Sequence, residues 1–412
     1  MLSLFEAYGV EIELMIVAKD SSLAVRPIAD ALLAAAEGGE IRGEHEAGPV
    51  TWSNELALHV IELKTTEPAR ALAPLGPAFA ASVREIAAIL DPLGARLLPS
   101  GMHPFMDPLR EMRLWPHDYG DVYAAFDRIF SCRGHGWANL QSVHLNLPFR
   151  GDAEFERLHA AIRHLLPILP ALAASSPFRE GRATGFRDTR LETYRANARA
   201  VPSVAGLVVP ETVRSRAEYE SRILGRIYAD MEPLDPEGVL RHEWVNSRGA
   251  IARFDRDTIE IRVLDSQEGP SADVAVAAAV VAAARALAAE AWAPLEGLRS
   301  FETERLSSIF LAAVRDGEET IVRDKAYLES LGVRSASARA GEAWESLVER
   351  TLAREADAGP FLPPLRRVFA QGTLATRLLR FAEGGSREAI AAAYEELARC
   401  LREDRGFDAP AR

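Results

Sequence analysis

Three segments of the chain place chemically active side chains two residues apart in an apolar, strand-like context. They are V-E-I-E-L-M-I-V with Glu11 and Glu13, S-V-H-L-N-L-P-F with His144 and Asn146, and T-I-E-I-R-V-L with Glu260 and Arg262. Side chains at positions i and i+2 of a strand point to the same face of a sheet. The three segments therefore predict antiparallel strands with an apolar face in the core and a polar face lining a cleft.

Each pair also has a plainer structural interpretation, which the residues alone leave open. Glu11 and Glu13 could form the exposed face of an edge strand, because two neighbouring carboxylates are costly to bury. His144 could be a hydrogen-bonded structural histidine, and Glu260 and Arg262 could form an ion pair on a half-exposed strand. The recurrence of the pattern on three strands favours a functional cleft.

Such a cleft would be rich in carboxylates, because Glu55 and Glu62 surround the strand predicted over Leu56–Lys64. The candidate metal ligands are Glu11, Glu13, Glu55, Glu62, His144 and Glu260. A set of hard oxygen ligands with one imidazole and no thiolate suits Mg²⁺ or Mn²⁺ better than zinc or copper. These ions commonly bind substrate phosphates, so a nucleoside triphosphate is the expected cofactor.

Arginines that could neutralise a transferred phosphate gather in residues 179–199 and in the hairpin predicted around residue 256, and include Arg190, Arg248 and Arg262. An arginine-rich loop is also common on solvated surfaces. This feature alone therefore does not distinguish a phosphate-binding loop from an ordinary surface loop. The chain contains neither a G-x-x-x-x-G-K-[ST] nor a G-x-G-x-x-G phosphate loop, and no G-x-S-x-G. Cys132 lies close to His135 in sequence, but so short a loop rarely positions a catalytic base, and no cysteine nucleophile is expected.

The elements that must position these residues alternate along the first part of the chain. Strands are predicted over Tyr8–Val17, Leu56–Lys64, Ser142–Phe149, Glu243–Phe254 and Thr258–Leu264, and helices over Ile28–Glu37, Leu72–Leu90, Asp121–Ser131, Phe155–Ala174 and Ala217–Met231. Residues 175–210 lack periodicity and suggest a long ordered loop over a site. Residues 271–412 are rich in alanine, leucine, glutamate and arginine, which predicts a catalytic region over 1–270 and a largely helical region over 271–412 packed on it.

Composition narrows the class of protein further. The 412 residues include 48 basic and 60 acidic side chains, a net charge of −12, which argues against a nucleic-acid partner. The apolar stretch Ala272–Ala289 is interrupted by Asp273 and Arg285, so no membrane span is expected, and the acidic N-terminal segment does not resemble a signal peptide. Only two cysteines are present, which favours a reducing, cytoplasmic compartment. Small-molecule substrates are expected, and a homo-oligomer remains open.

Six motifs in order along residues 8–270 resemble the glutamate–cysteine ligase family, in particular its bacterial carboxylate–amine ligase branch. They are Gly9-Val10-Glu11-Ile12-Glu13, Val60-Ile61-Glu62-Leu63-Lys64-Thr65, Gly101-Met102-His103-Pro104-Phe105, Ser142-Val143-His144-Leu145-Asn146, Ser175-Ser176-Pro177-Phe178 with Thr184-Gly185 and Arg190, and Thr258-Ile259-Glu260-Ile261-Arg262. The chain departs from the branch at Arg179, where tryptophan is common.

The resemblance implies an α+β fold like that of glutamine synthetase, in which a curved antiparallel sheet forms a funnel that binds ATP and magnesium. It implies a ligase that phosphorylates the side-chain carboxylate of glutamate and lets an amine attack the acyl phosphate, as in glutathione biosynthesis, with cysteine as the leading acceptor. The six acidic and imidazole residues would hold metal, and Arg262 and Arg190, with Arg248 as a further clamp, would contact phosphate or substrate carboxylate. Two alternatives remain: a phosphotransferase acting on a guanidine or similar acceptor, and a non-catalytic nucleotide-binding protein on the same fold.

Overall fold

A single antiparallel sheet of eight strands organises the computed structural model, which describes residues 2–409. The strand order is β2-β3-β4-β1-β6-β10-β9, and β5 pairs with the far end of β1. The strands are β1 Gly9–Ala18, β2 Glu44–Ala47, β3 Val50–Asn54, β4 Val60–Thr65, β5 Ala95–Leu98, β6 Ser142–Pro148, β9 Ala250–Arg253 and β10 Thr258–Asp265. Two short hairpins, β7 Phe178–Arg179 with β8 Arg182–Ala183 and β11 Ile321–Val322 with β12 Ala338–Arg339, lie outside this sheet.

The alternation of residue types gives the sheet two different faces. Ile12, Leu14, Leu145 and Ile261 are buried on one face, whereas Glu11, Glu13, His144 and Glu260 occupy alternate positions on the other. A slip of one residue in any strand would move its acidic side chains into the core. The hydrophobic pattern therefore fixes which side chains reach the polar face.

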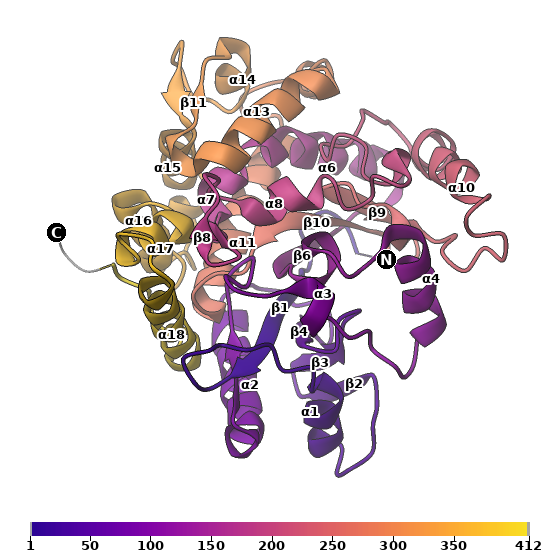
Figure 1. The fold of residues 1–412 in the computed structure, drawn as a ribbon. Helices are drawn as coiled ribbons and strands as arrows, with labels where there is room; N and C mark the ends of the chain where they lie inside the picture. The colour runs from indigo at the N-terminus through magenta and orange to yellow at the C-terminus, as the bar shows by residue number, and fades with distance from the viewer. Residues whose placement is uncertain (1, 410–412) are drawn as a thin grey trace.

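Helices cover the apolar face and surround the sheet (Figure 1). The helices are α1 Ala29–Ala36, α2 Leu75–Leu90, α3 Pro108–Glu111, α4 Gly120–Phe130, α5 His135–Ala138, α6 Gly151–Leu165, α7 Pro170–Ala173, α8 Thr189–Tyr194, α9 Arg216–Tyr219, α10 Gly225–Met231, α11 Pro270–Ala288, α12 Leu295–Arg299, α13 Thr303–Asp316, α14 Lys325–Ser330, α15 Ala340–Arg350, α16 Leu362–Gln371, α17 Leu374–Phe381 and α18 Arg387–Glu403. Helix α11 contacts α2, α6 and β1, and α6 and α7 contact β10. These contacts place the main core between the sheet and α11.

Helix α11 is apolar around its whole circumference, as expected for a helix surrounded by protein. It is the one helix in residues 2–409 that is long and apolar enough to cross a membrane, and most of it is buried inside the protein, as in the core helix of a soluble protein. The hydrophobic core is continuous from β1 through α11 to α18. The division predicted at residue 270 is not tested by this packing and stays a prediction.

The predicted architecture of a large antiparallel sheet with flanking helices is confirmed, but several elements differ from their predicted ranges. The strand predicted over Leu56–Lys64 begins at Val60, and the helix predicted over Phe155–Ala174 is divided between α6 and α7. Residues 175–210 contain the β7–β8 hairpin and α8, and Asp188 caps α8 by accepting a hydrogen bond from the backbone N–H of Leu191 at 2.8 Å. The strand predicted over Glu243–Phe254 is confined to Ala250–Arg253, preceded by a 3₁₀ turn at Glu243–Val245. In that region the Asn246 side chain donates to the Tyr219 hydroxyl at 2.7 Å.

Candidate functional site

Strand register brings acidic side chains and an imidazole together on the polar face of the sheet. Glu11 of β1 lies opposite His144 of β6, and Glu13 lies opposite Glu62 of β4. Glu260 of β10 lies opposite Asn146 of β6. Directly opposed residues in antiparallel strands have Cβ atoms about 4.5–5.5 Å apart. Four strands therefore contribute to one cluster.

His144 is at the centre of this cluster. Its Nδ1 lies 2.9 Å from Oε2 of Glu11 and 3.9 Å from Oε1 of Glu260, and its Nε2 lies 3.9 Å from Oε1 of Glu13. The backbone N–H and hydroxyl of Ser142 donate to Oε2 of Glu13 at 2.7 and 2.8 Å. These hydrogen bonds hold the side chains of Glu11 and Glu13 toward the imidazole.

Charge interactions shift the pKa values of both central partners. Burial disfavours the charged form of Glu11, but the hydrogen bond and positive charge of His144 outweigh it and lower the pKa of Glu11 to about 2. Burial likewise opposes protonation of His144, but the hydrogen bond to Glu11 and the charges of Glu13, Glu11 and Glu260 raise the pKa of His144 to about 9. Both shifts arise from the short contact between the carboxylate and the imidazole, and a metal ion bound by His144 would displace the proton of the imidazole.

The remaining carboxylates are not fully compensated by the cations of the chain. Burial and the charge of Glu13 raise the pKa of Glu55 to about 7. Burial and the charges of Glu11 and Glu55 raise the pKa of Glu62 well above its ordinary value. A dense group of oxygen donors carrying excess negative charge suits a hard divalent cation such as Mg²⁺ or Mn²⁺.

The geometry of one subset of these donors fits a single ion. Ligand atoms of Glu11, Glu62 and His144 lie within 4.8 Å of one another. Glu13 and Glu260 flank this group through their contacts with His144, and Glu55 follows β3 and lines the same cavity as Glu13. All six predicted ligands thus lie on the polar face or at its rim.

Of the three predicted arginines, Arg262 and Arg190 reach the same face. Nε of Arg262 donates to Oε1 of Glu260 at 2.5 Å, and Nη1 of Arg253 donates to Oε2 of Glu260 at 3.2 Å. Burial opposes ionisation of Glu260, but these arginines lower its pKa. Glu260 is therefore held as a carboxylate between two guanidinium groups.

Arg190 is buried and fixed by Asp265. Its Nε donates to Oδ1 of Asp265, and its Nη1 donates to the backbone carbonyl of Arg262 at 3.2 Å. Asp265 also accepts hydrogen bonds from the Ser175 N–H and the Ser176 hydroxyl, both at 2.8 Å. Nη2 of Arg190 is buried without a hydrogen-bond partner among the described residues, and Arg190 lines the cavity. The guanidinium is thus rigidly held with one nitrogen available to a ligand.

Arg248 has a different environment. Its Nε and Nη2 donate to the two oxygens of Glu211 at 2.6 and 2.8 Å, and it does not line the cavity that Arg190 and Arg262 share. Its predicted role as a clamp stays a prediction that this geometry does not support. Arg179 and His103 also lie outside that lining, and Nε2 of His103 is bonded to the backbone carbonyl of Leu23 at 2.8 Å.

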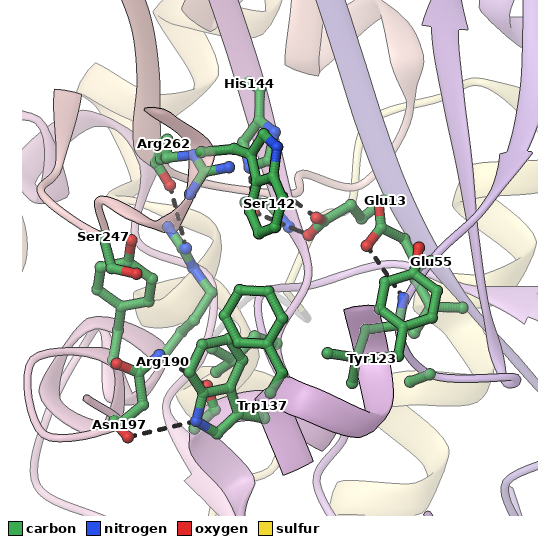
Figure 2. Close-up of a pocket in the computed structure, with 18 residues that line it drawn as sticks. Glu13, Glu55, Tyr123, Trp137, Ser142, His144, Arg190, Asn197, Ser247 and Arg262 are labelled. Atoms are coloured by element: carbon green, nitrogen blue, oxygen red, sulfur yellow. Dashed lines mark hydrogen bonds and ion pairs between the residues drawn. The ribbon is translucent and has the colours of Figure 1, made fainter. Parts of the chain in front are cut away.

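A cavity of about 230 Å³ opens on this face and is lined by charged, polar and aromatic side chains (Figure 2); its charged residues are called the floor here and its apolar residues the wall. The floor carries Glu13, Glu55, His144, Arg190 and Arg262. The wall is formed mainly by Leu56, Phe126, Trp137, Leu140 and Trp244. The rings of Phe126 and Trp137 pack with centroids 5.2 Å apart, and those of Phe126 and Trp244 with centroids 5.7 Å apart. A ligand here would meet charge on one side and aromatic surface on the other.

Two further cavities extend the polar face on either side of β4. One of about 500 Å³ includes Glu11, Lys64, Asn146 and Arg256, and one of about 680 Å³ includes Glu62 and Lys64. Lys64 lies between them and within 3.9 Å of Glu62. The face is therefore large enough for a nucleotide and a second substrate at once.

The sequence interpretation missed several residues of the site. Asp265 lies three residues after Arg262, the last residue of T-x-E-x-R, and this position was the one available signal. Trp137 lies in the short helix α5 and Trp244 in the 3₁₀ turn after His242. Both elements are too short to show a hydrophobic periodicity that would predict which side chains face a cavity. Ser142 could have been found, because it shares the alternating face of His144 and Asn146.

Solved structures share this fold across nearly the whole chain. The bifunctional glutathione synthetase of Pasteurella multocida matches 97% of this chain with a TM-score of 0.64 and 13% identity, and this chain spans 53% of that protein. The glutamate–cysteine ligase of Francisella tularensis, solved in complex with AMP, matches 98% of this chain and 90% of its own with a TM-score of 0.60 and 12% identity. At such low identity the likeness defines the fold class, that of these ligases.

A family model described as glutamate-cysteine ligase family 2 matches residues 7–396, and the chain belongs to this family of ligases. A protein of Archaeoglobus fulgidus without an assigned function is 37% identical over 377 residues, covering 91% of this chain and 93% of its own. A protein of Rubrobacter xylanophilus provisionally named glutamate–cysteine ligase 2-3 is 30% identical over 357 residues, covering 84% and 83%. The resemblance inferred from the six motifs is confirmed.

Proposed function

We propose that the protein is an ATP-dependent carboxylate–amine ligase that joins the side-chain carboxylate of glutamate to an amine. The observation that carries the proposal is the convergence of Glu11, Glu13, Glu62, His144 and Glu260 with Arg190 and Arg262 on one face of the sheet. A carboxylate is a poor acyl donor until it is activated. Transfer of the γ-phosphoryl group of ATP would convert it to an acyl phosphate, and attack by the amine would give the amide and release phosphate.

The polar face contains the groups that this chemistry requires. Glu11, Glu62 and His144, flanked by Glu13, Glu55 and Glu260, would hold Mg²⁺ or Mn²⁺. Bound there, the ions would screen the negative charge of the triphosphate. Arg190 and Arg262 would bind the substrate carboxylate or the transferred phosphoryl group, because the planar guanidinium matches both groups. Asp265 would keep Arg190 oriented while leaving its Nη2 free for the ligand.

The apolar wall of the smaller cavity bears on the choice of acceptor. Phe126, Trp137, Leu140 and Trp244 form an apolar surface next to Arg190 and Arg262. Tyr194, Asn197 and Ser247 add hydrogen-bonding groups to the same lining, so the mixed surface suits an acceptor with a small side chain of intermediate polarity. Cysteine meets this requirement and is the leading acceptor. A cytoplasmic location would supply both ATP and the amino acid.

An acceptor screen tests the proposal. Purified protein is incubated with ATP, Mg²⁺ and glutamate together with single amino acids or simple amines, and the products are identified by mass. The proposal predicts an amide, with release of ADP and phosphate that requires both glutamate and an amine. A phosphorylated acceptor without amide would establish the phosphotransferase alternative, and nucleotide binding without turnover of any substrate pair would establish the non-catalytic one.

A further inference from the structure

A second kind of cavity lies away from the polar face, between α2, β5 and α18. It has a volume of about 280 Å³ and is lined by four cationic side chains, Lys19, Arg96, Arg399 and Arg402. No carboxylate lines it within the part of the chain that the structure describes. In a protein with a net charge of −12, a cavity lined only by cations and apolar groups is unexpected.

Acidic residues nearby restrain some of these cations without entering the cavity. Lys19 and Arg402 both pair with Asp91, the latter at 2.9 Å, and Arg399 pairs with Glu396. These ion pairs hold three of the cationic side chains in place at the cavity wall. Their remaining hydrogen-bond donors are available to an anion.

Arg96 differs from the other three. It has no ion pair within 4.0 Å, and its Nε and Nη2 are buried without hydrogen-bond partners among residues 2–409. Burial lowers the pKa of Arg96, the charges of Glu395 and Asp20 raise it, and the charge of Arg399 lowers it, with a net lowering. The side chain is only partly buried, but its two buried nitrogens have lost hydration that no acceptor among the described residues replaces. An anion in the cavity would remove this cost.

The rest of the cavity wall is apolar. Val83 and Ala87 of α2, Leu97 of β5, and Ala398 and Leu401 of α18 complete the lining. A fully hydrated inorganic ion would leave this apolar surface unused. An organic anion with a compact apolar body would contact both kinds of surface, as ligands of small-molecule sites usually do.

We propose that this cavity binds a small organic anion that carries a phosphate or carboxylate group on an apolar body. The anionic group contacts Arg96, with Arg399, Arg402 and Lys19 around it, and the body lies against α2 and α18. None of these residues lines the cavities of the polar face. The ligand therefore binds apart from the proposed catalytic face, and it joins the C-terminal helix α18 to β5 and to the end of β1.

Calorimetric titration of the full-length protein at low ionic strength tests this site, with phenyl phosphate, benzoate and inorganic phosphate as probes. The variants are Arg96→Gln and Arg399→Gln, and Arg110→Gln is the matched control because Arg110 is 86% exposed and does not line this cavity. We expect saturable binding of phenyl phosphate or benzoate to the wild type and the control, weakened at least 10-fold in both variants, with inorganic phosphate binding more weakly than the better organic probe.

The outcomes separate this site from the polar face. The comparison between the two organic probes shows whether phosphate or carboxylate is preferred. Binding that is unchanged in Arg96→Gln and Arg399→Gln would report the polar face and would overturn the proposal, as would the absence of saturable binding to the wild type. Circular dichroism establishes that each variant is folded, and the exposed Arg399 position keeps the test valid if Arg96→Gln fails to fold. Neither outcome depends on ligase activity.

Discussion

His144 and Glu11 face each other across two neighbouring antiparallel strands, with Nδ1 of the imidazole 2.9 Å from Oε2 of the carboxylate. The contact depends on the register between β1 and β6, because a slip of one residue would turn one partner into the core. Glu13, Glu62 and Glu260 are placed around this pair by the same sheet. The chemistry of the site therefore rests on strand pairing.

The substitution Glu13→Gln should reduce ATP turnover about 100-fold or more, because it removes a charge from the proposed metal ligands at nearly constant volume. Both hydrogen bonds from Ser142 end at one oxygen of Glu13, and the Gln carbonyl can accept both, so the fold should persist. Steady-state kinetics measure the effect, and circular dichroism checks the fold. The control is Glu345→Gln, an exposed position on α15. Rates for Glu13→Gln within a few-fold of this control would reject the assignment.

Asp265→Asn should impair binding of the carboxylate substrate, because Arg190 loses its ionic partner and its fixed orientation. We expect KM for that substrate to rise about 10-fold or more with a smaller change in kcat. Breaking this buried pair should also lower the free energy of unfolding by about 3 kcal/mol. Urea denaturation and initial rates measure the two effects. An unchanged KM in a folded variant would show that Asp265 has no positioning role.

Cys132→Ser should retain activity. Cys132 is buried, and burial followed by the charge of Asp127 raises the pKa of its thiol to about 12, so almost no thiolate forms at neutral pH. The same turnover assay with the wild type as reference tests this. Complete loss of activity in a folded variant would restore the cysteine nucleophile that the sequence interpretation set aside.

The stability of Asp273→Asn should differ from that of the wild type in a pH-dependent manner. Asp273 is buried at the start of α11, where burial raises its pKa well above the ordinary value and only the Gln267 N–H donates to it, at 2.7 Å. The unfolded chain loses this proton at lower pH than the folded protein does, so the wild type loses stability as pH rises above about 4. The variant lacks this loss.

Urea denaturation at several pH values measures this difference. The stability advantage of Asp273→Asn should be smallest near pH 4 and grow by up to about 1.4 kcal/mol per pH unit, until the folded-state pKa of Asp273 is reached. A difference that stays constant between pH 4 and 7 would contradict the raised pKa.

The strands that carry the site could be predicted because each has a period of two. Alternation in Val10–Leu14, Ser142–Leu147 and Thr258–Val263 gave both the strand and the face of its polar residues. The order of the motifs then gave the family and the fold, which the comparisons confirm. The roles of the six metal-ligand candidates stay predictions, although the structure brings them to one face.

Other features depend on contacts between distant segments, which no local pattern encodes. Asp265 and Arg190 are 75 positions apart, and the sequence does not show that Arg248 pairs with Glu211. The aromatic wall combines Phe126, Trp137 and Trp244 from separate short elements. The cationic cavity joins Lys19 and Arg96 to Arg399 of α18, which is more than 300 residues away from both in sequence. Only the folded chain reveals these groups.

The transfer of oxygen from the carboxylate donor to phosphate tests the proposed reaction most directly. Glutamate labelled with ¹⁸O in its side-chain carboxylate is supplied with ATP, Mg²⁺ and the acceptor that the screen identifies, and the phosphate released is analysed by mass. Activation through an acyl phosphate predicts one ¹⁸O atom in the phosphate for each amide formed. Amide formation with unlabelled phosphate, or release of labelled glutamate unchanged while ATP is consumed, would contradict it.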